Sequence, residues 1–174
     1  CIRDRNIHVM AGLASGKKAQ DTFIANLHYA CEMGRQNNTN ILIEPLNTKD
    51  TPGYFLNSTN HAMDIIKTVN CKNLKLMFDC YHIQLMQGNL NDLLKDLVSH
   101  IGHIQFASVP NRGPPGNGDV DFQDLFLTIK KLGWTQPLGA EYKPTGDTKE
   151  TLNWLQVRFL PIQRNHPFRE KIFS

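Results

Sequence analysis

The chain has 174 residues, of which 40% are hydrophobic and 20% are charged, a composition typical of a globular protein with one apolar core. Its formal net charge is only +3 and its basic residues are scattered, so the sequence gives no sign of a nucleic-acid-binding surface. Neither an apolar stretch of about 18 residues nor a secretory signal pattern is found, so we expect no membrane partner. The four cysteines lack metal-binding spacing, which favours reduced thiols and a cytoplasmic protein.

Short apolar runs of strand length alternate with amphipathic patterns along the chain. The runs cover residues 7–10, 41–44, 74–79, 103–107 and 138–142. Between them, apolar residues recur at helical spacing around residues 23–31, 62–69, 90–98 and 122–129, which predicts helices with one buried face. A last helix is predicted after DTKE, residues 147–150, where Asp147 can cap the helix and Glu150 can reach back.

The spacing of the runs predicts the fold class. Consecutive runs begin 34, 33, 29 and 35 residues apart, and such strict alternation indicates a parallel sheet with crossover helices. A doubly wound sheet and a (β/α)₈ TIM barrel both fit this pattern. No glycine-rich phosphate-binding motif follows any run, which weakens the nucleotide-binding alternative. A barrel has about 250 residues, so five βα units would be present and three missing.

Four of the predicted strands carry an oxygen ligand at or near the same end. Glu44, Asp79 and Glu141 lie at the ends of three runs, and Gln105 lies near the end of a fourth. In a barrel, this end carries the active site. An all-oxygen set suits Mg²⁺ or Mn²⁺ better than Zn²⁺. We therefore predict a divalent metal site, which would also explain why the apolar run ILIEPLN places a carboxylate, Glu44, in buried surroundings.

Several stretches of the chain are distinctive: IHVMAG at 7–12, IEPLNTKDTPGYFL at 43–56, FDCYHIQLMQGNL at 78–90, HIQFASVPNRGPPGNGDVDF at 103–122 and GAEYKPTGDT at 139–148. Together they closely resemble the hydroxypyruvate isomerase family, a group of xylose-isomerase-like barrels. The resemblance implies that residues 1–174 form a single partial domain holding roughly the last five βα units of the barrel. The first three units would be missing, and residues 160–174 form an atypical tail.

The resemblance implies a metal held by Glu44, Asp79, Gln105 and Glu141, and a reaction that interconverts hydroxypyruvate and 2-hydroxy-3-oxopropanoate through an enediolate. Glu44 and Glu141 are the predicted acid and base pair.

Other residues receive supporting roles. His82 resembles a substrate contact, Arg112 could bind the substrate carboxylate through two hydrogen bonds, and His103 shares a strand face with Gln105. We expect His8 to pack in its strand, and Asn47 and Lys143 to be solvated loop residues.

Three functions are compatible with these residues. The first is the isomerase, acting on a small hydroxy-keto acid. The second is a metal-dependent ketose 3-epimerase, although its third metal ligand is typically His, and Gln105 argues against it. The third is an inactive half-barrel that acts only as a binding partner. Because its outer strands would lack neighbours and its inner face would expose aliphatic side chains, the chain alone is expected to be inactive and to associate, as a homo-oligomer or within a longer protein.

Overall fold

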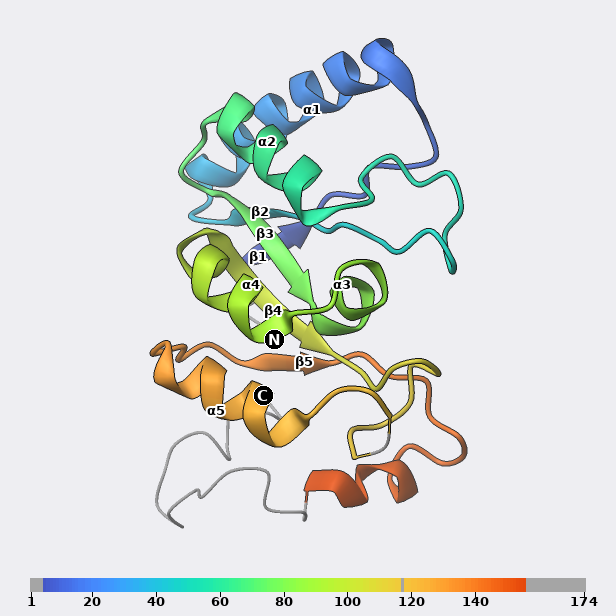
Figure 1. Cartoon of the computed structure of the whole chain (residues 1–174). Helices are drawn as coiled ribbons and strands as arrows, with labels where there is room; N and C mark the ends of the chain where they lie inside the picture. The colour runs from blue at the N-terminus through green and yellow to red at the C-terminus, as the bar shows by residue number, and fades with distance from the viewer. Residues whose placement is uncertain (1–4, 117, 156–174) are drawn as a thin grey trace.

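The computed structural model describes residues 5–116 and 118–155 (Figure 1). Five parallel strands form one sheet in the order β1-β2-β3-β4-β5, so spatial order follows chain order. The strands are β1 Asn6–His8, β2 Asn40–Ile43, β3 Leu74–Asp79, β4 Ile101–Phe106 and β5 Leu138–Ala140. All five predicted strands are present, and the parallel half-barrel confirms the predicted partial (β/α)₈ architecture.

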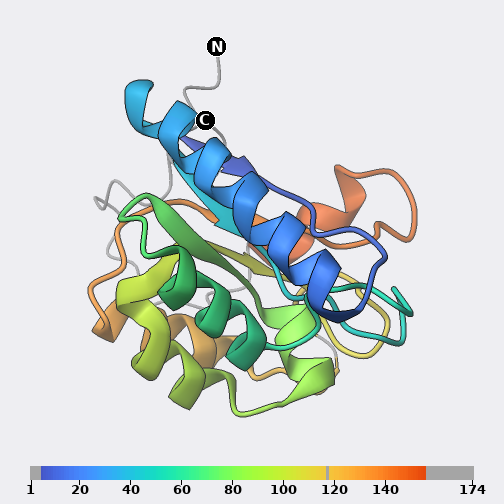
Figure 2. The same cartoon turned by 90° about the horizontal axis from the view of Figure 1, so that it is seen from above.

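The helices wrap around one face of the twisted sheet (Figures 1 and 2). They are α1 Gly16–Gln36, α2 Thr59–Val69, α3 Cys80–Met86, α4 Leu90–Leu97 and α5 Phe122–Lys131, with 3₁₀ turns η1 Val98–His100 and η2 Glu150–Leu155. No helix in the described ranges is long and apolar enough to cross a membrane.

Each strand turns alternate side chains to the two faces of the sheet, and this alternation separates the core from the site. Towards the helices, paired residues such as Ile43 and Leu76, or Phe78 and Ile104, are buried in one large apolar cluster. Towards the inner face, Asp79 is paired with Gln105. The same register that fills the core therefore gathers polar side chains on the opposite face.

Two predictions about helices were wrong. The region between β3 and β4 holds two helices rather than one, because the Asp79 carboxylate accepts the backbone N–H of Tyr81 at 2.8 Å and starts the short helix α3 directly after the strand. Seven residues are too few for a periodic pattern to reveal such a helix. The helix predicted after residues 147–150 is a 3₁₀ turn, η2, although the Asp147 side chain accepts the backbone N–H of Lys149 as a cap. The tail at 160–174 lies outside the described residues.

The inner face does not expose the aliphatic side chains that were predicted there. Leu42 and Met77 are buried, at 1% and 7% exposure. The Leu42 side chain occupies the space that a side chain at Gly102 would need. A Cβ at Gly102 would lie 2.5 Å from Cδ2 of Leu42. Exposed apolar side chains lie instead on β1 and on the segment after it, where Ile7, Met10 and Leu13 are more than half exposed.

Within the residues that the structure describes, the sheet has two open edges, because β1 and β5 each pair with a single neighbour. We expect the isolated chain to associate in solution, since an open edge offers unpaired backbone groups and Ile7 adds exposed apolar surface beside them. Size-exclusion chromatography with light scattering should show species larger than one chain. Ile7→Lys should reduce the association, whereas Tyr29→Lys, a change of another exposed residue on α1, should not. A monodisperse monomer at all concentrations would contradict this expectation.

Candidate active site

Five strand ends meet at one end of the sheet, and each carries a polar side chain. His8 is the last residue of β1, Glu44 follows β2, and Asp79 ends β3. Gln105 lies one residue before the end of β4, and Glu141 follows β5, where its backbone N–H donates to the Phe106 carbonyl at 3.1 Å. The prediction that four oxygen ligands lie at the same end of the strands therefore matches their positions.

The structure brings part of this set together. Single ligand atoms of Glu44, Asp79 and His82 all lie within 4.8 Å of one another, a group that does not include Glu141. Arg112 reaches in from the loop after β4, with Nη2 2.8 Å from Glu141 Oε2 and 3.7 Å from Asp79 Oδ2. His8 Nε2 lies 3.7 Å from Glu44 Oε2. The result is a compact group of carboxylates with cationic or neutral nitrogen groups around it.

Burial makes this arrangement costly without a ligand. Glu44 is 6% exposed and Asp79 is 1% exposed. Six buried side-chain polar atoms in the described residues accept or donate no hydrogen bond, and four of them belong to this site: His8 Nε2, Glu44 Oε1, Asp79 Oδ2 and Gln105 Oε1. Buried polar atoms are normally hydrogen-bonded or bind an ion. Three orphaned oxygens on neighbouring strands fit a hard divalent cation.

The charges of the carboxylates lead to the same interpretation. Burial raises the pKa of Glu44, and together with the nearby Asp79 and Glu141 carboxylates it brings that pKa to about 8 against the opposing charge of Arg112. Burial also raises the pKa of Asp79, against the hydrogen bond from the Tyr81 N–H. Without a bound cation, the buried site thus disfavours the ionised form of these carboxylates. A bound cation would favour the ionised form.

His82, predicted as a substrate contact, lies on α3 beside Asp79. It is 2% exposed, and its Nε2 is 3.8 Å from Asp79 Oδ2. Burial, together with the Arg112 charge, lowers the pKa of His82 to about 4, so the ring is neutral at physiological pH. A neutral ring suits a hydrogen bond to a substrate oxygen.

Arg112 lies beside the site and pairs with a side chain of the site itself. Its guanidinium binds the Glu141 carboxylate and the Glu141 carbonyl oxygen, and stacks 5.0 Å from the centre of the Tyr81 ring. Its φ is positive, at 52°, and its backbone carbonyl accepts the N–H of Lys143 after β5 at 2.7 Å. The role of Arg112 as a clamp for a substrate carboxylate stays a prediction.

The remaining predicted residue, His103, lies on the inner face of β4, as expected from its spacing to Gln105. Both flank Gly139 of β5: a Cβ at Gly139 would lie 2.9 Å from His103 Nε2 and 3.1 Å from Gln105 Cγ. Gly139 thus leaves room for both side chains.

Sequence reasoning underrated two residues. His8 was expected only to pack, yet it lies against Glu44. Asn47 was expected to be a solvated loop residue, yet it is 2% exposed and contacts His82 across 35 positions of sequence. No local pattern could have revealed that contact; the position of Asn47 three residues after Glu44 was the only available signal.

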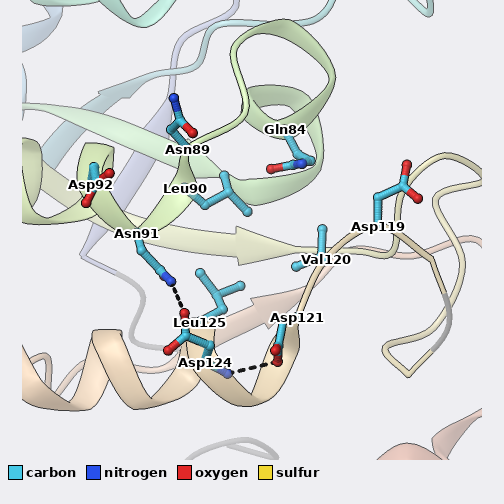
Figure 3. A pocket seen from close by; sticks show the side chains of 10 residues that line it. All are labelled: Gln84, Asn89, Leu90, Asn91, Asp92, Asp119, Val120, Asp121, Asp124 and Leu125. Atoms are coloured by element: carbon cyan, nitrogen blue, oxygen red, sulfur yellow. Dashed lines mark hydrogen bonds between the residues drawn. The ribbon is translucent and has the colours of Figure 1, made fainter.

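A second hollow, between α4 and the start of α5, also contains several acidic residues (Figure 3). Two of its carboxylates have structural roles: Asp121 accepts the backbone N–H of Asp124 as the cap of α5, and Asp124 accepts a hydrogen bond from Asn91. These carboxylates do not form a cluster of three potential ligand atoms in the described residues, unlike the group around Glu44. The hollow is therefore not the candidate site.

The raised pKa of Glu44 predicts a gain in stability when its carboxylate is replaced. Above about pH 8, where the buried carboxylate is ionised, Glu44→Gln should raise the free energy of unfolding in EDTA by about 1–3 kcal/mol, the range for an unsatisfied buried group. Below the ordinary pKa of 4.5, where the carboxyl is protonated in both states, the gain should be lost. Urea unfolding would measure it, with Asp64→Asn, an exposed change on α2, as the control. A less stable Glu44→Gln variant would show that the carboxylate already has a stabilising partner.

Comparisons with known proteins agree with this fold. A family model described as xylose isomerase-like TIM barrel matches residues 3–158. The chain is 40% identical over 159 residues to the 2-oxo-tetronate isomerase of Cupriavidus necator. The matched region covers 89% of this chain and 61% of that protein. It is 38% identical over 141 residues to the hydroxypyruvate isomerase of Escherichia coli, with 81% and 55% covered.

One solved structure is similar along most of the chain. The crystal structure of AP endonuclease, family 2 from Brucella melitensis superposes with a TM-score of 0.84 at 36% identity, covering 88% of this chain and 60% of that one. The chain spans less than two thirds of the length of each of these three relatives. Since the family model and the fold both match over most of its length, the chain belongs to the xylose isomerase-like TIM barrel family.

Proposed function

We propose that this chain carries the metal-binding and proton-transfer half of an isomerase that interconverts hydroxypyruvate and 2-hydroxy-3-oxopropanoate. The observation that carries the proposal is the group of buried oxygens of Glu44, Asp79 and Gln105 that lack a hydrogen bond at adjoining strand ends, with Glu141 beside Asp79. Two relatives that share about two fifths of its aligned residues are named as isomerases of small oxo acids.

Glu44, Asp79, Gln105 and Glu141 would hold Mg²⁺ or Mn²⁺. Such a cation acts as a Lewis acid that stabilises negative charge on oxygens of the substrate. The proton transfers would be carried out by side chains of this chain.

The reaction moves hydrogen between the neighbouring carbons of an α-hydroxy carbonyl compound. One glutamate removes a proton from C3 of hydroxypyruvate, which gives an enediolate. A proton is then returned to C2 while the proton of the C3 hydroxyl passes to the oxygen on C2, which gives 2-hydroxy-3-oxopropanoate. Glu44 follows β2 and Glu141 follows β5, and strands β3 and β4 lie between them in the sheet. We assign these two glutamates as this acid and base pair, with His82 as a hydrogen-bond donor to a substrate oxygen.

Gln105 favours an isomerase over a ketose 3-epimerase, whose corresponding ligand is typically His. Gln105 contributes an amide oxygen, and its Oε1 is buried without a hydrogen bond.

An assay of a completed barrel tests the proposed function. The chain would be joined to the part of the Escherichia coli hydroxypyruvate isomerase that it does not match, and assayed with hydroxypyruvate and with 2-oxo-tetronate. Turnover of hydroxypyruvate that EDTA abolishes and Mn²⁺ or Mg²⁺ restores would support the proposal. A completed, metal-loaded barrel that turns over only 2-oxo-tetronate would refute the substrate, and one that turns over neither would refute the isomerase.

Arg112→Ala in the same completed barrel should raise KM for hydroxypyruvate by about 10- to 100-fold, because a hydrogen-bonded charge pair contributes about 1.5–3 kcal/mol. The conversion of a substrate without a carboxylate, such as glyceraldehyde, should change little. Arg35→Ala, which removes an arginine from the exposed face of α1, is the control. Equal effects on both substrates would show that Arg112 only positions Glu141.

A further inference from the structure

A chain of hydrogen bonds behind the site fixes the orientation of Asn47. The backbone N–H of Asp50 donates to Asn47 Oδ1 at 2.8 Å, and Asn47 Nδ2 donates to Asp50 Oδ2 at 3.1 Å. The Tyr81 hydroxyl donates to the same Asp50 oxygen at 2.7 Å. Because a backbone N–H can only donate, it identifies Oδ1, and therefore also identifies the amide nitrogen that faces His82.

Two donors of Asn47 point at one nitrogen of His82. The backbone N–H of Asn47 lies 3.1 Å from His82 Nδ1, and Asn47 Nδ2 lies 2.7 Å from the same atom. Neither group can accept a hydrogen bond, so Nδ1 must be the acceptor and carries no proton. In a neutral ring the proton then lies on Nε2, the atom that faces the site 3.8 Å from Asp79 Oδ2.

We propose that Asn47 is a positioning residue that holds His82 as its Nε2–H tautomer, so that His82 serves the site as a hydrogen-bond donor to a substrate oxygen and not as a metal ligand. To bind a metal, Nε2 of His82 would have to be unprotonated, and the proton of the neutral ring would then lie on Nδ1. There it would face the two N–H donors of Asn47. The role at a substrate oxygen rests on the proposed function; the tautomer itself rests only on the contacts of Asn47. Asp50 and Tyr81 support Asn47 from behind.

Nitrogen NMR of the chain with ¹⁵N-labelled histidine tests the tautomer directly. The His82 signals, identified by their loss in His82→Gln, should show a bare Nδ1 and a protonated Nε2. Asn47→Asp places a carboxylate oxygen where the amide donated, and should move a proton onto Nδ1. Asn57→Asp, the same change at an exposed loop position, should leave the spectrum unchanged. A proton on Nδ1 in the wild-type chain, or an unchanged spectrum in Asn47→Asp, would overturn the proposal.

Metal titration provides the second test. His82→Gln should keep the Mn²⁺ affinity of the wild-type chain, whereas Asp79→Asn should lower it. An equal loss in both variants would make His82 a ligand and overturn the proposal. Because the NMR spectrum needs neither metal nor turnover, its result is separate from the assay: a completed barrel without isomerase activity would refute the proposed function, while the spectrum alone decides the tautomer.

Discussion

Glu141→Gln in the completed barrel should lower kcat by about 10²- to 10⁴-fold, the usual contribution of a positioned acid or base, with a much smaller change in KM. Glutamine keeps the size of the side chain and one oxygen, and it can still lie beside Arg112, but it cannot accept a proton. Glu150→Gln makes the same change at an exposed position and should leave kcat unaltered.

Steady-state kinetics at saturating Mn²⁺ would measure the effect, so that any weakening of metal binding does not mimic a loss of chemistry. Solvent-hydrogen exchange into the substrate gives a second measurement, because it reports proton removal even where product release limits turnover. An unchanged kcat would remove Glu141 from the acid and base pair.

Asp79→Asn should weaken Mn²⁺ binding by on the order of 10²-fold or more, since even partners of metal ligands contribute 10- to 100-fold. Asp79 is the most buried acidic side chain of the site, and its Oδ2 makes no hydrogen bond. The asparagine keeps the oxygen that accepts the Tyr81 N–H, so α3 should still form.

Isothermal titration calorimetry of the chain with Mn²⁺ would measure this loss. Asp92→Asn is the matched control, because Asp92 lines the second acidic hollow in Figure 3 and its side chain is 76% exposed. Similar affinities for Asp79→Asn and the wild-type chain would place the ion elsewhere. A large loss in Asp92→Asn would identify the second hollow as a metal site.

The sequence predicted the features that depend on local periodicity. Apolar runs located all five strands, and a carboxylate directly after a run, as at Glu44 and Asp79, was enough to place both side chains at the same end of the sheet. The parallel order followed from the spacing of the runs. These features are local because a strand and its terminal residue are neighbours in the chain.

Contacts between distant residues could not be predicted in the same way. The bond between Asn47 and His82 depends on how α3 packs beside the loop after β2, and no short pattern encodes that packing. The inner face was also misjudged, because the space left by Gly102 and filled by Leu42 exists only once β2, β3 and β4 lie side by side. The ion pair of Arg112 with Glu141 likewise joins two residues that lie 29 positions apart in the chain.

The Asp79 side chain has two uses, one in the fold and one in the site. One of its carboxylate oxygens caps α3 by accepting the Tyr81 N–H, and the other faces the site without a hydrogen bond. If Glu44, Asp79, Gln105 and Glu141 held a divalent cation, the same side chain would join the start of a seven-residue helix to that ion. Metal binding would then also stabilise the start of α3, where His82 lies.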